Sequence, residues 1–523
     1  MLAAVSGEVG EGPGAMLAGL DDLRGLVRGL AHAQRDRAPV IVLTGGGDDA
    51  GLLAPAVKAT VVVEASSVGH WIAHAAQLAM TDPRGPVHLR LGAGVADEPA
   101  LPVAAACRPA PLPPPAPAVL EALAAVLAGA TRPLLITGLE CGPDDTRWIR
   151  SFAEALPAPV LATTKGKGAL ADPHPLALGA LVAGHAALGR ADLIVLLGVD
   201  DGELPPGVLP VGVPVVRIGR APWPDGRFLV EAHGDLALVI EELAPHVRAQ
   251  RAADWDVAEV DRIKRAVTRT TTPATRLVAL AREATPAGTL ATGDVPALAA
   301  WQAVGPRETL RPLGESTPGY AVVAALGAQL THPARRVVAF TSPGGLAAAE
   351  PALAIAGARG LPIVVVVMGP LAGERARAMQ SAGCLVAGPL RPRQALLLGG
   401  GLLGDDLPLD PVVGGLRDHL LRDEIVLALV GAVLDDLLGV GLADAFERLQ
   451  LLGRRGVDVD QLGLLGLRLG GLVLRGLGKR SGRSQQPGGH HGDHDQRNQS
   501  PHTGLLVDGF GRRRQRLYRK CTF

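Results

Sequence analysis

The sequence has few cysteines and few aromatic side chains. Its 523 residues include four cysteines, which lie far apart and form no CxxC pair, and aromatic residues make up only 2% of the chain. Cysteines spaced in this way exclude a disulfide framework and are typical of a reduced, cytoplasmic protein. With so few aromatic rings, alanine, leucine and valine must fill the hydrophobic cores, and this favours α/β layers.

The chain also lacks an excess of either charge and lacks any long apolar run. Lys and Arg together number 51, as do Asp and Glu, so the formal net charge is zero. No global field therefore steers the protein toward nucleic acid or an anionic membrane. No apolar run approaches the roughly 20 residues that a membrane helix needs, and the N-terminus has no signal-peptide pattern. We therefore expect a cytoplasmic protein without nucleic-acid or membrane partners.

What the sequence does have is a recurring alternation of apolar strands and helices. Strands that are apolar throughout, separated by helices, indicate parallel sheets covered on both faces. A chain of this length is too long for one hydrophobic core. We predict three consecutive α/β domains at residues 1–106, 118–245 and 276–390, with a proline-rich linker at 107–117 and a helical connector at 246–275.

Beyond the third predicted domain the alternation stops. Residues 391–523 are low in complexity and rich in Leu, Gly, Asp and Arg, and we predict no fold for them. Their His- and Asp-rich tract at 490–495 either binds a transition metal or is a flexible polar segment, and the polar segment is favoured. Their basic run at 512–520 either contacts nucleic acid or is solvated, and the solvated run is favoured. Two hypotheses remain for this tail: a divergent, disordered extension, or translation outside the ancestral reading frame.

One stretch of the third domain has the outline of a cofactor-phosphate site. The apolar strand 336–340 is followed by TSPGGLAAAEPALAIAGARGLPIVVVVMGP (341–370), which predicts a glycine-containing turn, one Ala-rich helix and a second strand. Such a turn directs a helix N-terminus and free N–H groups at an anion. Yet the only charged residues in the stretch are Glu350 and Arg359, so the turn has no carboxylate with which to hold a metal.

A series of short motifs extends this pattern along the three predicted domains. The motifs are Gly12-Pro13-Gly14-Ala15 (with a helix expected after it), Pro39 to Gly45, Gly85-Pro86-Val87, Arg132-Pro133 to Gly138, Thr163 to Gly168, Asp172-Pro173-His174-Pro175, Ala191 to Gly198, Gly293-Asp294 and Thr317 to Ala328. In order and spacing this series resembles the thiamine-diphosphate-dependent enzymes of the acetolactate synthase and 2-oxo-acid decarboxylase group.

The resemblance implies a fold, cofactors and a class of reaction. In that family a pyrimidine-binding, a central and a diphosphate-binding domain follow one another, all α/β, and the members form dimers or tetramers. It implies thiamine diphosphate and Mg²⁺ as cofactors, a 2-oxo acid as substrate, and decarboxylation or carboligation as the lyase or transferase reaction. Flavin-containing relatives carry FAD in the central domain, although no GxGxxG fingerprint follows any strand here.

The resemblance also assigns roles to the turn that follows strand 336–340. It implies diphosphate contacts from Gly319, Ser342, Gly344 and Gly345. It aligns residues 342–344 with a GDG turn whose Asp binds Mg²⁺, and residues 369–370 with an Asn pair that supplies a second ligand. Mg²⁺ requires hard oxygen ligands, and Pro343 and Gly369 have no side-chain oxygen. The sequence therefore predicts no metal ligand at this turn.

A second departure from the family concerns its glutamate, which hydrogen-bonds the aminopyrimidine so that the thiazolium carbon can be deprotonated. The only acidic residues before Gly12 are Glu8 and Glu11, and both are out of place for that role. The first domain is therefore predicted to be truncated. We expect a catalytically impaired acetolactate-synthase-like protein with no catalytic residue assigned. The alternative hypothesis is a catalytically dead paralogue that acts as a binding or scaffold subunit, or the product of a decayed gene.

Other polar residues have simpler interpretations. His70 and His74 lie one helical turn apart, as in zinc helices, but no Glu follows His70 and no third ligand is evident, so we predict no metal there. Lys165 and Lys167 either reach an anionic ligand or lie on the surface of a loop, and the surface position is favoured. For His174, in a turn motif, a structural role is favoured over catalysis.

Overall fold

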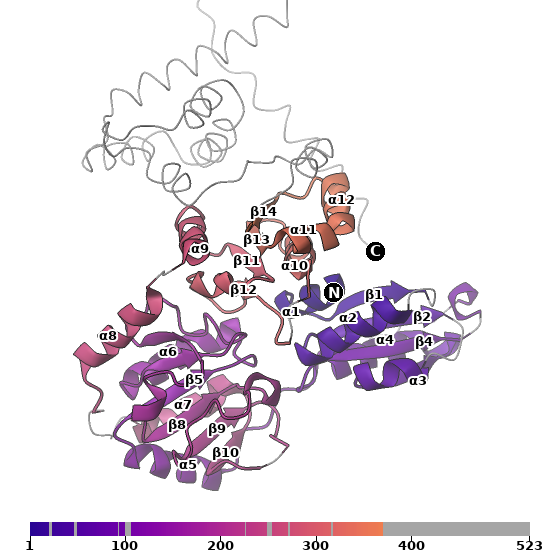
Figure 1. Ribbon diagram of the computed structural model, residues 1–523. Helices are drawn as coiled ribbons and strands as arrows, with labels where there is room; N and C mark the ends of the chain where they lie inside the picture. The colour runs from indigo at the N-terminus through magenta and orange to yellow at the C-terminus, as the bar shows by residue number, and fades with distance from the viewer. Residues whose placement is uncertain are drawn as a thin grey trace, which may run out of the picture. The chain divides into compact units, whose positions relative to one another are not determined.

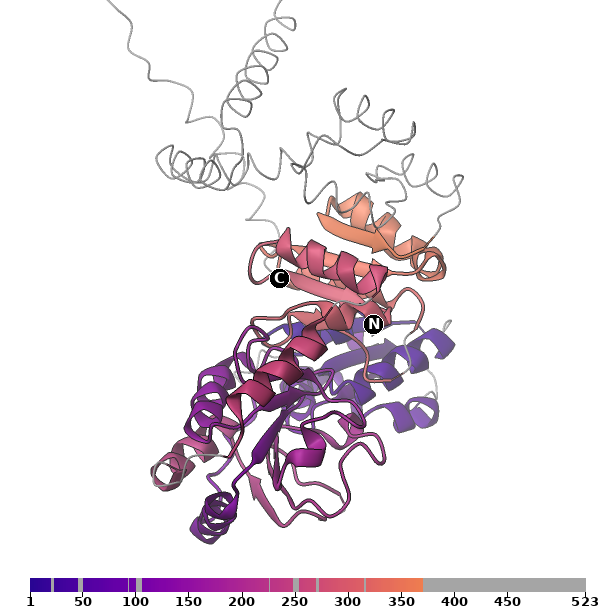
Figure 2. The same cartoon turned by 60° about the vertical axis from the view of Figure 1, so that its left-hand side comes forward.

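The computed structural model describes residues 1–369 apart from 20–22, 46–49, 93, 100–105, 225, 248–253, 270–271 and 315–316. These residues belong to one compact unit, Met1–Leu407. They form three parallel β-sheets with helices packed against them (Figures 1 and 2), which confirms the predicted α/β class. No helix within the described ranges is both long and apolar enough to cross a membrane. The predicted tail at 391–523 lies outside the described residues.

The first sheet has the strand order β1-β2-β4-β3. Its strands are β1 (Gly14–Ala18), β2 (Val40–Gly45), β3 (Thr60–Val63) and β4 (Pro86–Leu91), and its helices are α1 (Leu2–Val9), α2 (Leu23–Arg35), α3 (Ala50–Leu53) and α4 (Val68–Met80). The central strands β2 and β4 are buried along most of their length. Because both faces of these strands are covered, they appear in the sequence as continuous apolar runs.

The glycine motif at 12–14 leads into strand β1, which the sequence did not predict, and the helix predicted before strand 39–45 follows as α2. Gly14 begins β1, and a Cβ on Gly14 would lie 1.9 Å from the carbonyl oxygen of Ala3 on α1. Glycine is therefore required for the close approach of α1 to β1. Strand β1 was not predicted, because a glycine needed for close packing gives the same sequence signal as one that shapes a turn.

The second sheet has the order β10-β9-β8-β5-β6-β7. Its strands are β5 (Pro133–Thr137), β6 (Val160–Ala162), β7 (Ala177–Ala180), β8 (Leu193–Leu197), β9 (Val215–Gly219) and β10 (Val230–His233); its helices are α5 (Pro117–Gly129), α6 (Thr146–Ala155) and α7 (Leu236–Val247), and α8 (Val257–Thr268) packs beside β7. Every residue of β5 and β8 is buried. These two strands therefore form the centre of the largest hydrophobic cores of the described chain.

The third sheet has the order β12-β11-β13-β14. Its strands are β11 (Leu290–Gly293), β12 (Thr309–Leu310), β13 (Val337–Thr341) and β14 (Ile363–Val367), and its helices are α9 (Pro273–Glu283), α10 (Tyr320–Thr331), α11 (Pro343–Ala348) and α12 (Glu350–Arg359). Helix α10 is buried on almost every side and packs on β11 and β13. The carboxyl ends of β11 and β13 and the start of α10 thus meet at one edge of the sheet.

The Ala-rich segment after β13 forms two helices, α11 and α12, where the sequence predicted one. Ala349 separates them with a non-helical backbone (φ −101°, ψ 6°). Pro351 is the cause, because proline has no N–H and its ring would clash with the carbonyl of Ala347 in a continuous helix. The turn after β13 is therefore followed by only six helical residues.

Substitution of Gly14 by alanine tests its packing role. Gly14→Ala should lower the free energy of unfolding by about 1–3 kcal/mol, because the new Cβ overlaps the Ala3 carbonyl. Gly12→Ala is the matched control, since a Cβ on Gly12 meets nothing within 4 Å, and its effect should stay within about 0.5 kcal/mol. Urea unfolding of both variants measures the difference, and equal stabilities would contradict the packing role.

Candidate functional site

The turn after β13 is closed by its own serine. The Oγ atom of Ser342 accepts a hydrogen bond from the Gly345 N–H at 3.1 Å, and its carbonyl oxygen accepts one from the Leu346 N–H at 2.9 Å. Serine is a preferred N-cap because it pairs these otherwise unbonded N–H groups. Pro343, the first residue of α11, has no N–H to offer. The turn therefore uses its donors largely for its own helix.

Asp294, directly after β11, occupies the space beside this turn. Its Oδ2 atom accepts hydrogen bonds from the Gly319 N–H at 2.9 Å and from the Thr341 hydroxyl at 3.0 Å. Gly319 caps α10 with a left-handed backbone (φ +87°) that glycine adopts without strain. A carboxylate at the N-terminus of α10 is stabilised by the helix dipole. In the sequence, Asp294 is marked only as part of the Gly293-Asp294 motif. Its position at the end of a predicted strand is the signal that could have identified it as a site residue.

The predicted diphosphate residues lie together, but most of their polar groups already have partners. A Cβ on Gly319 would lie 3.2 Å from the Gly345 carbonyl oxygen. A Cβ on Gly345 would lie 2.2 Å from Oγ1 of Thr341, so glycine is needed to accommodate the Thr341 side chain below the turn. Gly344 is exposed, and the space around it is more open than the space around Gly319 and Gly345. That Gly319, Ser342, Gly344 and Gly345 bind a diphosphate stays a prediction.

The two positions aligned with metal ligands are neighbours in space. A Cβ on Gly369 would lie 3.1 Å from Cδ and 3.2 Å from Cγ of Pro343. Neither residue has a side-chain oxygen. On α4, His70 and His74 are exposed and their rings stack at 6.3 Å. Across the described residues, no group of three His, Cys, Asp or Glu side chains could hold a metal ion.

Lys165 is buried in a cluster with two carboxylates. Its Nζ atom lies 2.6 Å from Oε1 of Glu8 and 3.0 Å from Oδ2 of Asp36. Burial raises the pKa of Glu8, against the opposing effect of Lys165. Burial also pulls the pKa of Lys165 down, but the two carboxylates together hold it above its ordinary value. The prediction of a surface lysine was wrong, because the acidic partners of Lys165 come from a distant part of the sequence.

Lys167 and His174 have structural partners in the same region. The Nζ atom of Lys167 lies 2.7 Å from Oδ2 of Asp172. The Nε2 atom of His174 lies 3.1 Å from Oε1 of Glu154. These contacts give both side chains partners within the chain, and a structural role for His174 stays a prediction.

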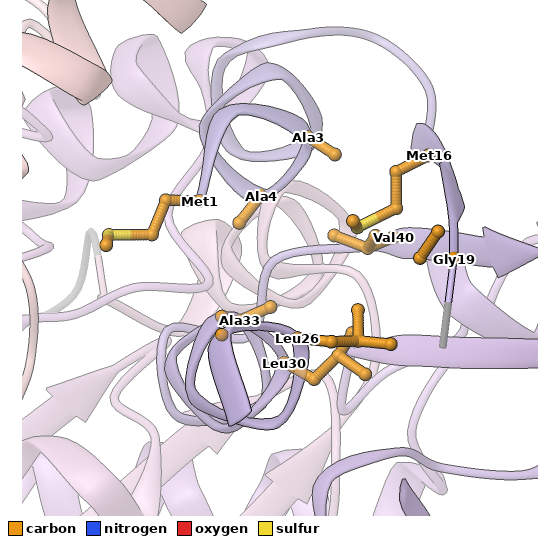
Figure 3. A pocket seen from close by; sticks show the side chains of 12 residues that line it. Met1, Ala3, Ala4, Met16, Gly19, Leu26, Leu30, Ala33 and Val40 are labelled. Carbon is orange, nitrogen blue, oxygen red and sulfur yellow. The ribbon is translucent and has the colours of Figure 1, made fainter. Parts of the chain in front are cut away.

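An apolar pocket of about 270 Å³ lies between α1, α2 and β1 (Figure 3). Leu26 and Leu30 of α2 lie across from Ala4 of α1, with Met16 of β1 at one side. The lining contains no charged side chain. No side chain of the lining could therefore form an ion pair with a diphosphate or a carboxylate substrate.

Comparison with known proteins connects these features. The thiamine pyrophosphate enzyme central domain matches residues 120–243, and the C-terminal TPP binding domain of the same enzymes matches residues 292–369. An acetolactate synthase large subunit of Parasynechococcus marenigrum is 28% identical over 422 residues, covering 70% of this chain and 66% of that protein. A probable 2-ketoarginine decarboxylase of Pseudomonas aeruginosa is 29% identical over 248 residues, covering 43% and 44%. The chain thus spans less than two thirds of the length of these relatives.

Solved structures share the fold. Benzoylformate decarboxylase from Polynucleobacter necessarius superimposes with a TM-score of 0.63 at 17% identity, covering 76% of this chain and 86% of that chain. A protein isolated from Mycobacterium smegmatis and described as a thiamin diphosphate-dependent enzyme gives a TM-score of 0.62 at 21% identity, covering 73% and 83%. At these identities the likeness establishes the fold alone, while the domain matches confirm the family resemblance found in the sequence.

Removal of the Lys165 charge tests the buried cluster. Lys165→Met should lower the free energy of unfolding by about 3–5 kcal/mol, because two carboxylates would stay buried without their cation. Lys167→Met, a control two residues away with a single acidic partner, should cost clearly less. Denaturant unfolding at neutral pH compares the two, and equal losses would exclude a special role for Lys165.

The stability of Lys165→Met should depend on pH with the sign opposite to that expected for a protein stabilised by an ion-paired carboxylate. Burial raises the pKa of Glu8 above its unfolded value of 4.5, and removal of Lys165 removes the main effect that opposes this rise. The folded variant then binds the Glu8 proton more tightly than the unfolded chain, so the contribution of Glu8 to stability is largest below about pH 4.5 and is lost as the pH rises through the raised pKa. Melting temperatures measured from pH 4.5 to 8, relative to the wild type, follow this loss.

Proposed function

We propose, on the premise that this chain belongs to the thiamine-diphosphate-dependent enzyme family, that it is an acetolactate-synthase-like member with impaired catalysis. The impairment is in the binding of the Mg²⁺–diphosphate complex by the C-terminal domain. Decarboxylation or carboligation of 2-oxo acids then proceeds slowly or not at all on this chain.

The observation that carries this proposal is the contact between Pro343 and Gly369. Both positions align with metal ligands of the family, they lie side by side, and neither offers a side-chain oxygen. Mg²⁺ takes oxygen ligands in near-octahedral geometry and does not bind a proline ring. The residues present therefore do not fit a bound Mg²⁺.

The surrounding donors do not replace the missing cation. The N–H of Gly319 is bonded to Asp294, and the N–H of Gly345 is bonded to Ser342. An exposed helix N-terminus favours an anion by only about 0.3–1 kcal/mol, and α11 is short. The Asp294 carboxylate, close to the turn, adds a negative charge that repels a diphosphate.

The substrate class and the assembly are inferred from the family. The matched relatives are named as an acetolactate synthase and a 2-ketoarginine decarboxylase, which supports a 2-oxo acid as the substrate of any residual activity. We infer a homo-oligomer, dimer or tetramer, located in the cytoplasm. The widely spaced cysteines of the sequence support that compartment.

A thermal-shift titration with thiamine diphosphate and Mg²⁺ tests the proposal. We expect no rise in melting temperature beyond that produced by Mg²⁺ alone. A ligand present at a hundredfold its Kd should stabilise the folded state by about 2.7 kcal/mol, which such a titration detects. The large subunit of Escherichia coli acetolactate synthase isozyme 1, another relative, serves as the assay control. A saturable, Mg²⁺-dependent rise with this chain would contradict the proposal.

Variants at Pro343 test whether the missing ligand is the cause. Pro343→Asp supplies a carboxylate beside Gly369, so it should give a Mg²⁺-dependent stabilisation by thiamine diphosphate that exceeds the wild-type response. Pro343→Ala removes the ring without adding an oxygen and should respond like the wild type. Equal responses of the two variants would show that loss of the ring, and not gain of a ligand, governs binding.

A further inference from the structure

The second sheet has the strand order at which open parallel sheets form a ligand-binding crevice. From β5 the chain adds β6 and β7 on one side and then β8 on the other. Ligands of such sheets bind outside the carboxyl ends of the strands at the point where the order reverses. Here that point lies between β5, which is followed by Gly138, and β8, which is followed by Gly198. By resemblance, flavin-containing relatives carry FAD in this domain.

The side chain of Glu203 fills this crevice. Its Oε2 atom accepts hydrogen bonds from the N–H of Leu139 at 2.8 Å and the N–H of Asp200 at 2.9 Å. Its Oε1 atom accepts one from the hydroxyl of Thr163 at 2.5 Å. These donors follow β5, β8 and β6, respectively. The Glu203 carboxylate thus accepts hydrogen bonds from donors at three strand ends. A bound phosphate would need these same donors.

The surrounding backbone closes on the carboxylate. A Cβ on Gly138 would lie 2.6 Å from Oε2 of Glu203 and 2.4 Å from Cα of Val199. A Cβ on Gly166 would lie 2.1 Å from the carbonyl oxygen of Thr137, because the loop after β6 lies against the end of β5. The glycines here make room for other parts of the same chain and leave no space for a diphosphate.

The loop that carries Glu203 is also fixed from outside the sheet. Asp200 is bonded through Oδ2 to Arg37 Nε at 2.8 Å, and Asp201 through Oδ1 to Arg37 Nη2 at 2.7 Å. Arg37 follows α2 of the first sheet. Two ion pairs from this one arginine therefore anchor the start of the loop that carries Glu203.

We propose that Glu203 is an internal ligand of the central domain: its carboxylate occupies the anion position of the crevice, so the domain holds neither FAD nor another nucleotide phosphate. The residues present do not fit the flavin that the family resemblance implies. Removal of this side chain opens a site for a small carboxylate. The proposal is independent of the Mg²⁺ site in the C-terminal domain, since the two sites share no residue.

The burial of Glu203 agrees with a role as an acceptor. Burial raises the pKa of Glu203 to about 7, while the bonds from Thr163, Asp200 and Leu139 lower it. Removal of this buried carboxyl group would leave its donors buried without an acceptor. Each such donor lowers the stability of the folded state. The role of Glu203 therefore rests on its three donors and not on catalysis.

Chemical rescue tests the proposal. Glu203→Ala should lower the melting temperature, and sodium formate should restore at least half of the loss in a saturable manner, relative to sodium chloride at equal ionic strength. The wild type should not respond to formate. Val199→Ala, which empties apolar volume beside the same crevice, is the matched control and should lose stability without rescue. Absence of rescue in Glu203→Ala, or equal rescue in both variants, would overturn the proposal.

A measurement on the wild-type protein keeps the proposal testable if Glu203→Ala does not fold. The purified full chain should show no flavin absorbance, and titration with FAD should leave the flavin fluorescence unquenched. Glu203→Gln, which keeps the shape and one oxygen acceptor, should behave in the same way. Saturable quenching of FAD by the wild type would refute an internally occupied crevice, whatever the outcome of the thiamine diphosphate titration.

Discussion

The Asp36 carboxylate holds together segments of all three sheets. Its Oδ1 atom accepts a hydrogen bond from the N–H of Leu313 at 2.9 Å, and its Oδ2 atom pairs with Lys165 at 3.0 Å. Lys165 in turn binds Glu8 of α1. Buried charges are tolerated only when partners and hydrogen bonds replace the lost water. The three domains therefore depend on one another: each supplies a polar group that the others need in order to bury theirs.

Much of the fold could be predicted from the sequence, because its signals are local. Strands β2, β8 and β13 are continuous apolar runs, and each is almost entirely buried. The break between α11 and α12 was also readable from Pro351, although we predicted one helix. The packing role of Gly14 could not be predicted, because the atom that requires a glycine there, the carbonyl oxygen of Ala3, is not marked in the sequence by any residue type.

The candidate site was predictable only in part. The alignment of Pro343 and Gly369 with metal-ligand positions came from the sequence, and the structure adds that the two residues are in contact. The burial of Lys165 could not be predicted, since its partner Glu8 lies 157 residues away in the chain. Glu203 was also missed, because an acid after a strand looks like any solvated side chain. Only the donors of three separate strand ends, brought together by folding, give it a distinct role.

The C-terminal and central domains have the same solution to one physical problem. Strand ends and helix starts expose N–H groups that must find acceptors when they are buried. In a cofactor-binding protein a phosphate supplies those acceptors; here Asp294, Ser342 and Glu203 supply them. An unbonded buried donor would cost about 1–3 kcal/mol, so these internal acceptors stabilise the glycine turns of the folded chain. A glycine-rich turn in such a fold therefore indicates an anion position, and the identity of the anion must be read from the nearest side-chain oxygen.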